Sequence, residues 1–211
     1  MPETRWQERS LGRSLHASTE RSRERGRRFV DAARELMGSS PELDFGVQEV
    51  VRHAGLSLRS FYQHFSGKDD LLLALYEELV REAVERAEKR VAKIADPLER
   101  LEVIVHRFYG DRGAFSSPMA AEVQSLARAR PDEIREALEP LLELLARVLA
   151  EAIAAGRVRR ADPRELALQV LLLLLIHTQA RGQQLMGGTW PVLSRSQVWD
   201  FCRRALAGEE G

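Results

Sequence analysis

The chain has 211 residues, enough for one large domain or two small ones. Its 32 basic side chains are balanced by 32 acidic ones, which excludes a surface that is basic throughout. A single cysteine, Cys202, excludes an internal disulfide and fits a reducing compartment. The longest apolar run, Val170 to Ile176, is far shorter than the roughly 18–20 residues that span a bilayer. The first residues also lack the apolar core of a signal peptide, so we expect a cytoplasmic protein without membrane contact.

The first 18 residues are polar, rich in arginine and without apolar periodicity. Residues 1–28 hold eight arginines against four glutamates. This composition predicts that residues 1–18 are disordered in the free protein. The segment is either an overhang without a role or a basic arm that reaches the minor groove or the backbone of DNA.

A first helix is predicted from Thr19 or Ser22 to Met37, where Gly38-Ser39-Ser40-Pro41 ends it. Its buried face consists of Phe29, Ala33, Leu36 and Met37. We expect this helix to brace the two shorter helices that follow it.

Residues 47–72, VQEVVRHAGLSLRSFYQHFSGKDDLL, indicate two short helices, a tight turn and the start of a further helix. The first short helix has apolar residues at the spacing i, i+3, i+4 and i+7, namely Val47, Val50, Val51 and Ala54. Gly55 accepts the left-handed conformation that ends a helix, and the Ser57 hydroxyl can cap the next one. Two helices joined by such a turn form a helix-turn-helix.

The second short helix has distinct faces when its residues are placed at about 100° each. The core face is predicted to be Leu58, Phe61 and Phe65, the outward face Arg59, Ser60 and Gln63, and the flanks Tyr62 and His64. The outward face of such a helix enters the major groove of DNA, and its flanks meet the phosphates. Arginine suits guanine, glutamine suits adenine and serine suits either. The candidate DNA-binding residues are Gln48, Ser57, Arg59, Ser60, Tyr62, Gln63, His64 and Lys68.

The run AGLSLRSFYQHFSGKDDLL at 54–72 resembles the signature of the TetR/AcrR family of bacterial transcriptional regulators. The shared elements are Ala54-Gly55, Ser57, Phe61-Tyr62, His64-Phe65, Lys68 and Leu71. The resemblance is strong from about Phe29 to Leu72, and beyond that only helical pattern and length agree. It implies that Tyr62, His64 and Lys68 contact phosphates and that Ser57 starts the recognition helix. In one departure, Gly46 stands where the family often has threonine, which removes a hydroxyl that could hold a phosphate.

A fourth helix is predicted to start at Ser66, which has the spacing of a capping box with Asp69, and to continue to about Ile94. It joins the head to the remaining chain and is therefore the natural lever between the two. Lys68 lies in its first turn, next to the positive end of the helix dipole, an arrangement that attracts phosphate.

Proline and capping residues mark the later helices, which we expect at about 97–109, 117–130, 131–155, 163–186 and 194–207. Pro140 falls inside one of them and should kink or divide it. No segment indicates a strand. The predicted fold is all-α with about nine helices: a helix-turn-helix head at 19–68, and a helical effector-binding and dimerisation domain at 69–211. The resemblance implies the same number of helices.

The helix from Pro163 is apolar almost all round over Val170 to Ile176, which predicts burial on both sides. One side can face its own domain and the other a second copy of the chain, unless the run is the plain core of a monomer. Reading a palindrome also needs two recognition helices. The resemblance implies a homodimer through about 163–186 and 194–207.

A ligand pocket is expected among the helices between 97 and 186. The candidate effector-binding residues are His106, Tyr109, Phe115, Met119 and His177. A buried His177 would need a hydrogen-bond partner. The resemblance implies that a pocket exists, but it does not select these side chains.

The sequence thus predicts a transcriptional repressor that binds a palindromic double-stranded operator as a dimer and is released by a small apolar or amphipathic effector. The alternative is a helix-turn-helix regulator controlled by a protein partner, or an activator, without a small-molecule ligand. Catalysis is not expected, because His106, Tyr109 and Asp111 have no accompanying nucleophile, metal-ligand spacing or glycine-rich phosphate loop. No cofactor or metal is expected.

Overall fold

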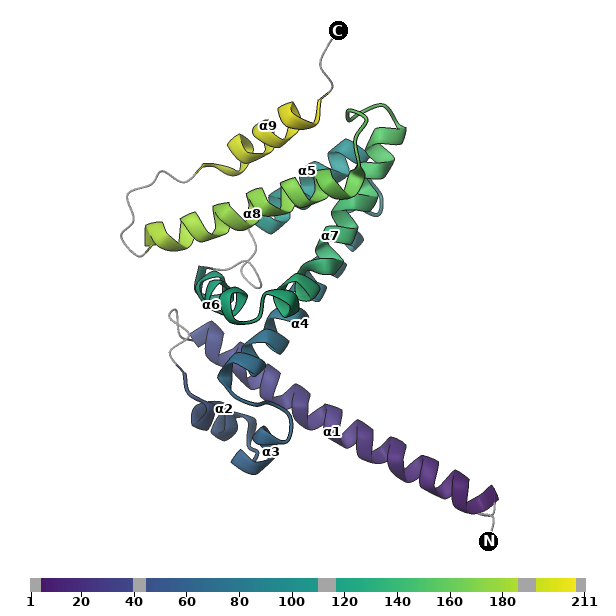
Figure 1. Ribbon diagram of the computed structural model, residues 1–211, viewed down its shortest axis with the longest axis vertical. Helices are drawn as coiled ribbons and strands as arrows, with labels where there is room; N and C mark the ends of the chain where they lie inside the picture. The colour runs from purple at the N-terminus through teal and green to yellow at the C-terminus, as the bar shows by residue number, and fades with distance from the viewer. Residues whose placement is uncertain (1–4, 40–44, 110–116, 186–192, 208–211) are drawn as a thin grey trace. The chain divides into compact units, whose positions relative to one another are not determined.

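The structure of the chain, a computed structural model, describes residues 5–39, 45–109, 117–185 and 193–207 (Figure 1). These ranges contain nine α-helices and no strand, as the sequence predicts. None of the helices in these ranges combines the length and the apolar character that crossing a bilayer requires. The chain divides into two compact units, unit 1 at Met1–Leu75 and unit 2 at Tyr76–Gly211. The division falls inside the fourth helix, α4, at Lys68–Val91.

Unit 1 contains α1 at Arg5–Ser39, α2 at Val47–Ala54, α3 at Leu58–Tyr62 and the first two turns of α4. The helix α1 begins far earlier than Thr19 or Ser22, which differs from the expected disordered arm over residues 1–18. Residues 5–18 contain no proline and a single glycine, and most of them are good helix formers such as arginine, glutamate and leucine. Residues 5–18 therefore favour a helix by their composition, although they lack the apolar periodicity that marks a buried helix face.

The core of unit 1 is an aromatic cluster that joins α1 to α3. Phe29 of α1 and Phe61 of α3 are completely buried, with ring centroids 5.3 Å apart and ring planes at 84°. Phe65, in the turn after α3, meets Phe29 at 6.2 Å and 87°. These edge-to-face arrangements are the ones that aromatic rings prefer. The predicted buried face of α1 is confirmed at Phe29, Ala33 and Leu36.

Unit 2 is built around α7 at Pro131–Ala154 and α8 at Pro163–Leu185, which pack against each other at an angle (Figure 1). The helices α5 at Pro97–Tyr109 and α6 at Ser117–Ala129 pack against this pair, and α9 at Arg195–Leu206 packs against α5. The buried residues of α8 are Leu166, Ala167, Val170, Leu171 and Leu174. On α9, burial raises the pKa of the Cys202 thiol to about 11, so this cysteine acts as a small apolar packing residue.

Two local expectations about these helices differ in part from the structure. Of the two expected effects of Pro140, a kink or a division, the division does not occur, because α7 continues through this residue. Pro140 removes the donor for the carbonyl of Glu136, but both residues are exposed, so water can satisfy that carbonyl. At the start of α4, Asp70 and not Asp69 accepts from the Ser66 N–H, at 2.8 Å, because the helix begins at Lys68. A complete capping box opens α9, in which Ser194 and Gln197 each accept from the other's backbone N–H.

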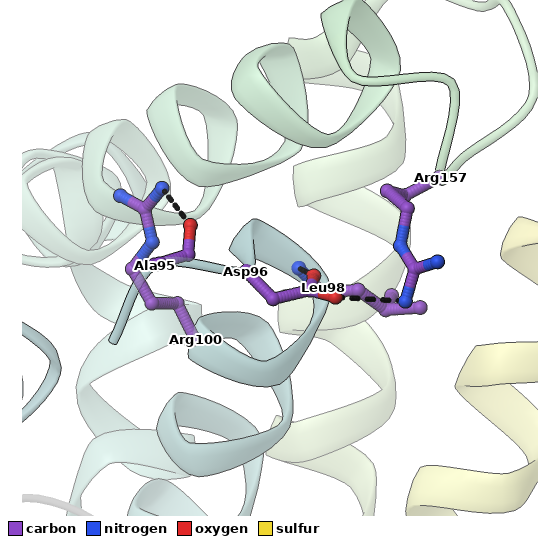
Figure 2. Close-up of polar contacts among 5 residues, drawn as sticks. All are labelled: Ala95, Asp96, Leu98, Arg100 and Arg157. Atoms are coloured by element: carbon purple, nitrogen blue, oxygen red, sulfur yellow. Dashed lines mark hydrogen bonds and ion pairs between the residues drawn. The ribbon is translucent and has the colours of Figure 1, made fainter.

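Polar contacts hold the segment between α4 and α5 against the end of α7. Asp96 caps α5: one carboxylate oxygen accepts from the Leu98 N–H at 2.8 Å, and the other accepts from Arg157 at 2.7 Å (Figure 2). The Leu98 N–H is the main reason why the pKa of Asp96 lies below its usual range, and the charge of Arg157 adds to this effect. Arg157 comes directly after Gly156, the glycine that follows α7 with a φ of 67°.

Two further ion pairs join the same region. Arg100 of α5 lies 2.6 Å from Glu151 of α7 and makes a long contact of 3.5 Å with the Ala95 carbonyl (Figure 2). Arg147 of α7 pairs with Glu88 near the end of α4. Such partly exposed pairs contribute little stability each, and only the Arg147–Glu88 pair involves α4 itself.

Candidate nucleic-acid interface

The turn between α2 and α3 depends on Gly55. Its φ of 62° places it in the left-handed region, where a side chain is strained. The Gly55 N–H donates to the Arg52 carbonyl and the Leu56 N–H to the Val51 carbonyl, each at 3.2 Å. This pair of bonds is a Schellman motif, which satisfies the carbonyls that the end of α2 leaves free.

Arg28 of α1 adds a second constraint on the same turn. Its guanidinium donates to the Ala54 carbonyl at 2.5 Å, which ties α1 to the last residue of α2. A β-carbon at position 55 would come within 3.3 Å of this guanidinium. The turn is therefore held both by its own backbone and by α1.

Ser57 caps α3 as predicted. Its hydroxyl accepts from the Ser60 N–H at 3.1 Å, and its carbonyl accepts from the Phe61 N–H at 3.1 Å. After Tyr62 the chain makes one more turn, in which the N–H groups of His64 and Phe65 both bond the Phe61 carbonyl at 2.9 Å. The helix-turn-helix geometry is thus confirmed.

Most of the candidate DNA-binding side chains are accessible on the surface of unit 1. Five of them are exposed: Gln48, Ser57, Arg59, Tyr62 and Gln63. Their accessibility makes DNA contact possible, and the contact itself remains a prediction.

Two side chains of α3 lie opposite to their expected positions. Ser60 was expected to face outward, but its side chain is buried, with a residue exposure of 8% and no hydrogen-bond partner for its hydroxyl among the described residues. Leu58 was expected in the core, but it is 42% exposed. Both differences correspond to one rotation of the short helix, which moves its buried side from Leu58 toward Ser60. The buried Ser60 is not placed to read a base.

The two predicted phosphate contacts at the end of the motif, His64 and Lys68, are half-buried. The His64 ring packs at 6.3 Å from the Phe29 ring, so the aromatic cluster fixes its position. The Lys68 ammonium lies 5.0 Å above the ring of Phe45, a cation–π contact at the start of α4. Phe45, which precedes α2, was not singled out by the sequence, because a lone aromatic residue outside a helix gives no periodic signal.

The expected effector residues are distributed over several helices of unit 2. Met119 of α6 is completely buried. His106 of α5 has a buried ring nitrogen without a partner in the described part of the chain, and its ring lies 6.4 Å from Trp199 of α9. A ring nitrogen of His177 lies 2.8 Å from the Leu173 carbonyl of its own helix. The side chain of Tyr109 and the whole of Phe115 lie outside the described residues.

Two hollows occur among the described residues of unit 2. The first is an apolar groove of about 230 Å³ between α7 and α8, with walls that include Leu138, Leu142 and Leu168. The second, of about 180 Å³, lies among α4, α5 and α7 beside the ion pairs of Arg100 and Arg147. Of the expected effector residues that the structure describes, His106, Met119 and His177, none lines either hollow, so an effector site at those residues remains a prediction.

Known proteins share both the motif and the fold. The family model described as "Bacterial regulatory proteins, tetR family" matches residues 29–75. The fatty acid metabolism regulator protein of Bacillus subtilis (strain 168) is 25% identical over 147 residues, which are 68% of this chain and 75% of that protein. The structure of FadR from Bacillus subtilis in complex with stearoyl-CoA has a TM-score of 0.64 at 19% identity, covering 87% of this chain and 98% of that one. The structure of RolR in complex with resorcinol has a TM-score of 0.68 at 18% identity, covering 90% and 91%.

The exposed face of α3 and the helical fold define a helix-turn-helix DNA-binding protein with an all-helical second unit. Residues 29–75 match the tetR family of bacterial regulatory proteins, the family that the resemblance at 54–72 implies, and the rest of the chain is similar to regulators of that fold. This family consists of DNA-binding regulators and not of enzymes.

Replacement of Gly55 by alanine should lower the free energy of unfolding by about 1–2 kcal/mol, because alanine is strained at positive φ. Gly38→Ala is the matched control: Gly38 lies within α1 with nothing near its β-position, so alanine should leave stability unchanged or raise it. Urea unfolding of both variants measures the difference. Equal stability of the two variants would show that the positive-φ turn is not formed in solution.

Proposed function

We propose that this protein is a repressor that binds a palindromic operator as a homodimer through α3, and that a small apolar or amphipathic effector releases it. The observation that carries the DNA-reading part is the exposure of Arg59 and Gln63 on one side of a helix whose opposite side is anchored by Phe61. Arginine and glutamine donors at this place suit guanine and adenine edges in the major groove. A regulator of chromosomal operators acts in the cytoplasm.

Arg59→Ala and Lys68→Ala should separate base reading from phosphate binding. Loss of Arg59 should cost about 1–3 kcal/mol on the best operator and relax the preference at one or two base pairs. Loss of Lys68 should weaken specific and non-specific duplexes alike and reduce the salt slope by about one. Fluorescence anisotropy with a panel of operator variants at several salt concentrations measures both effects. Unchanged relative affinities for Arg59→Ala would contradict the proposed orientation of α3.

The dimer part of the proposal rests on an apolar stripe of α8 that the chain itself leaves uncovered. Leu168, Leu172 and Ile176 recur every four residues and are 46%, 49% and 60% exposed. On α9, Phe201 is 61% exposed. A continuous stripe of this kind marks an interaction surface, in contrast to scattered single leucines. We assign it to a second copy of the chain, because two recognition helices about 34–36 Å apart are needed to read a palindrome.

Leu172→Glu should convert the dimer into a monomer at micromolar concentration, because an unpaired buried charge costs about 3–5 kcal/mol. The control is Gln124→Glu, which adds the same charge at an exposed position of α6. Sedimentation gives the oligomeric state, and binding to the palindrome should fall together with dimerisation. A wild-type monomer, or a Leu172→Glu variant that stays dimeric, would refute this surface.

The effector part of the proposal rests on unit 2 and on α4. Solved structures of similar fold are described in complex with stearoyl-CoA and with resorcinol, which are an amphipathic and an aromatic ligand. In this chain, Met119 is buried and His106 holds a ring nitrogen without a partner among the described residues. The helix α4 runs unbroken from unit 1 into unit 2, where Asp96 and Arg100 follow its end. A ligand that moves the far end of α4 would therefore also act on the head.

Effector and operator should each weaken the binding of the other by the same factor, with a coupling of about 1–3 kcal/mol. Thermal-shift screening with long-chain acyl-CoA and with small phenols identifies a ligand, and calorimetric titration is then repeated with operator bound. Equal affinity with and without operator would exclude this mechanism for that ligand. Failure of every ligand class, together with release of DNA by a purified protein partner, would instead support regulation by that partner.

A further inference from the structure

Leu58 is a large apolar residue on the exposed side of α3, the helix that we propose reads DNA. It is the first residue of α3, directly after the cap Ser57, and 42% of it is exposed. Tyr62, one turn later on the same side, is 58% exposed. Single exposed leucines need no explanation in general. This one differs because the packing of α3 turns Ser60 inward and Leu58 outward.

The position of Leu58 in the motif determines what it can meet. In a helix-turn-helix, the N-terminal residues of the recognition helix contact the edges of the bases. Arg59, the next residue, is exposed and supplies hydrogen-bond donors for such an edge. Leu58 has neither a donor nor an acceptor, so it can contribute to base reading through apolar contact alone. The major groove offers one apolar group at a base edge, the C5-methyl group of thymine.

We propose that Leu58 is a specificity-determining residue that selects thymine by packing its methyl groups against the thymine C5-methyl, beside the base pair that Arg59 reads. The inference rests on the proposed function, in which α3 reads the operator. Leu58 also rejects other bases. At cytosine or adenine it would displace water from an exocyclic amine without replacing the lost hydrogen bond. The half-site is thus expected to contain a thymine within one or two base pairs of the guanine bound by Arg59.

The methyl group can be tested directly on the DNA with the full-length wild-type protein. A preferred duplex is first selected from a random library, and each thymine of one half-site is then replaced in turn by deoxyuridine, which removes the methyl group and keeps the base pairing. One substitution should weaken binding by about fourfold, the factor expected for one buried methyl group. The other thymines of the half-site should show little effect.

Leu58→Ala links this effect to the protein. The variant should bind the thymine and deoxyuridine duplexes equally well, while its preference at the guanine of Arg59 persists. Leu193→Ala is the matched control, since it removes the same atoms from a leucine of similar exposure, 39%, in unit 2, and it should keep the wild-type discrimination. Because Leu58 is exposed, its truncation should leave the urea unfolding midpoint unchanged.

The possible outcomes separate this inference from the proposed function. If no deoxyuridine substitution weakens wild-type binding while Arg59→Ala still relaxes a base preference, the role of Leu58 is overturned and the proposed function stands. If Leu58→Ala still discriminates between thymine and deoxyuridine, another side chain reads the methyl group and the inference is wrong. If no duplex is selected over random sequence, both the proposed function and the role of Leu58 are overturned.

Discussion

The position of α3 depends on the packing of Phe29 against Phe61 and Phe65. A helix of five residues has too few internal hydrogen bonds to form by itself, so tertiary contacts must hold it. The aromatic cluster anchors one side of α3 to α1, and the Gly55 turn with the Arg28 guanidinium fixes where it begins. Because one side of α3 is fixed in this way, the direction of its exposed side is fixed as well. Arg59 and Gln63 can serve as rigid readers because the opposite side of their helix is immobilised.

Unit 2 divides its apolar surface in a different way. The helix α8 buries Leu166, Val170 and Leu174 against its own unit and leaves Leu168 and Leu172 uncovered. This uncovered side is the surface that we propose a second copy of the chain binds, so that two recognition helices can read a palindrome. The same division accounts for the apolar groove between α7 and α8, since its walls continue into the exposed stripe.

The helix α4 belongs to both units. It begins beside the motif, where Lys68 lies over the ring of Phe45, and ends at Val91; in unit 2 its Glu88 pairs with Arg147 of α7. This pair is partly exposed and weak, whereas Ala83, Ala87 and Val91 of the same helix are buried. The far half of α4 is therefore held by apolar packing more than by its ion pair.

The sequence by itself determined the all-helical fold, the helix-turn-helix and the family resemblance, but not the early start of α1. Periodicity, Gly55, Ser57 and the prolines at helix starts are local signals, and each was found where it was expected. Two features were decided by the tertiary structure, namely the rotation of α3 that exchanges Ser60 with Leu58 and the meeting of His106 with Trp199. The physical reason is that a single turn of helix carries too few residues for its periodicity to define the buried side. Trp199, the partner of His106, lies 93 positions further along the chain on another helix. A local sequence pattern cannot predict a contact between residues so far apart.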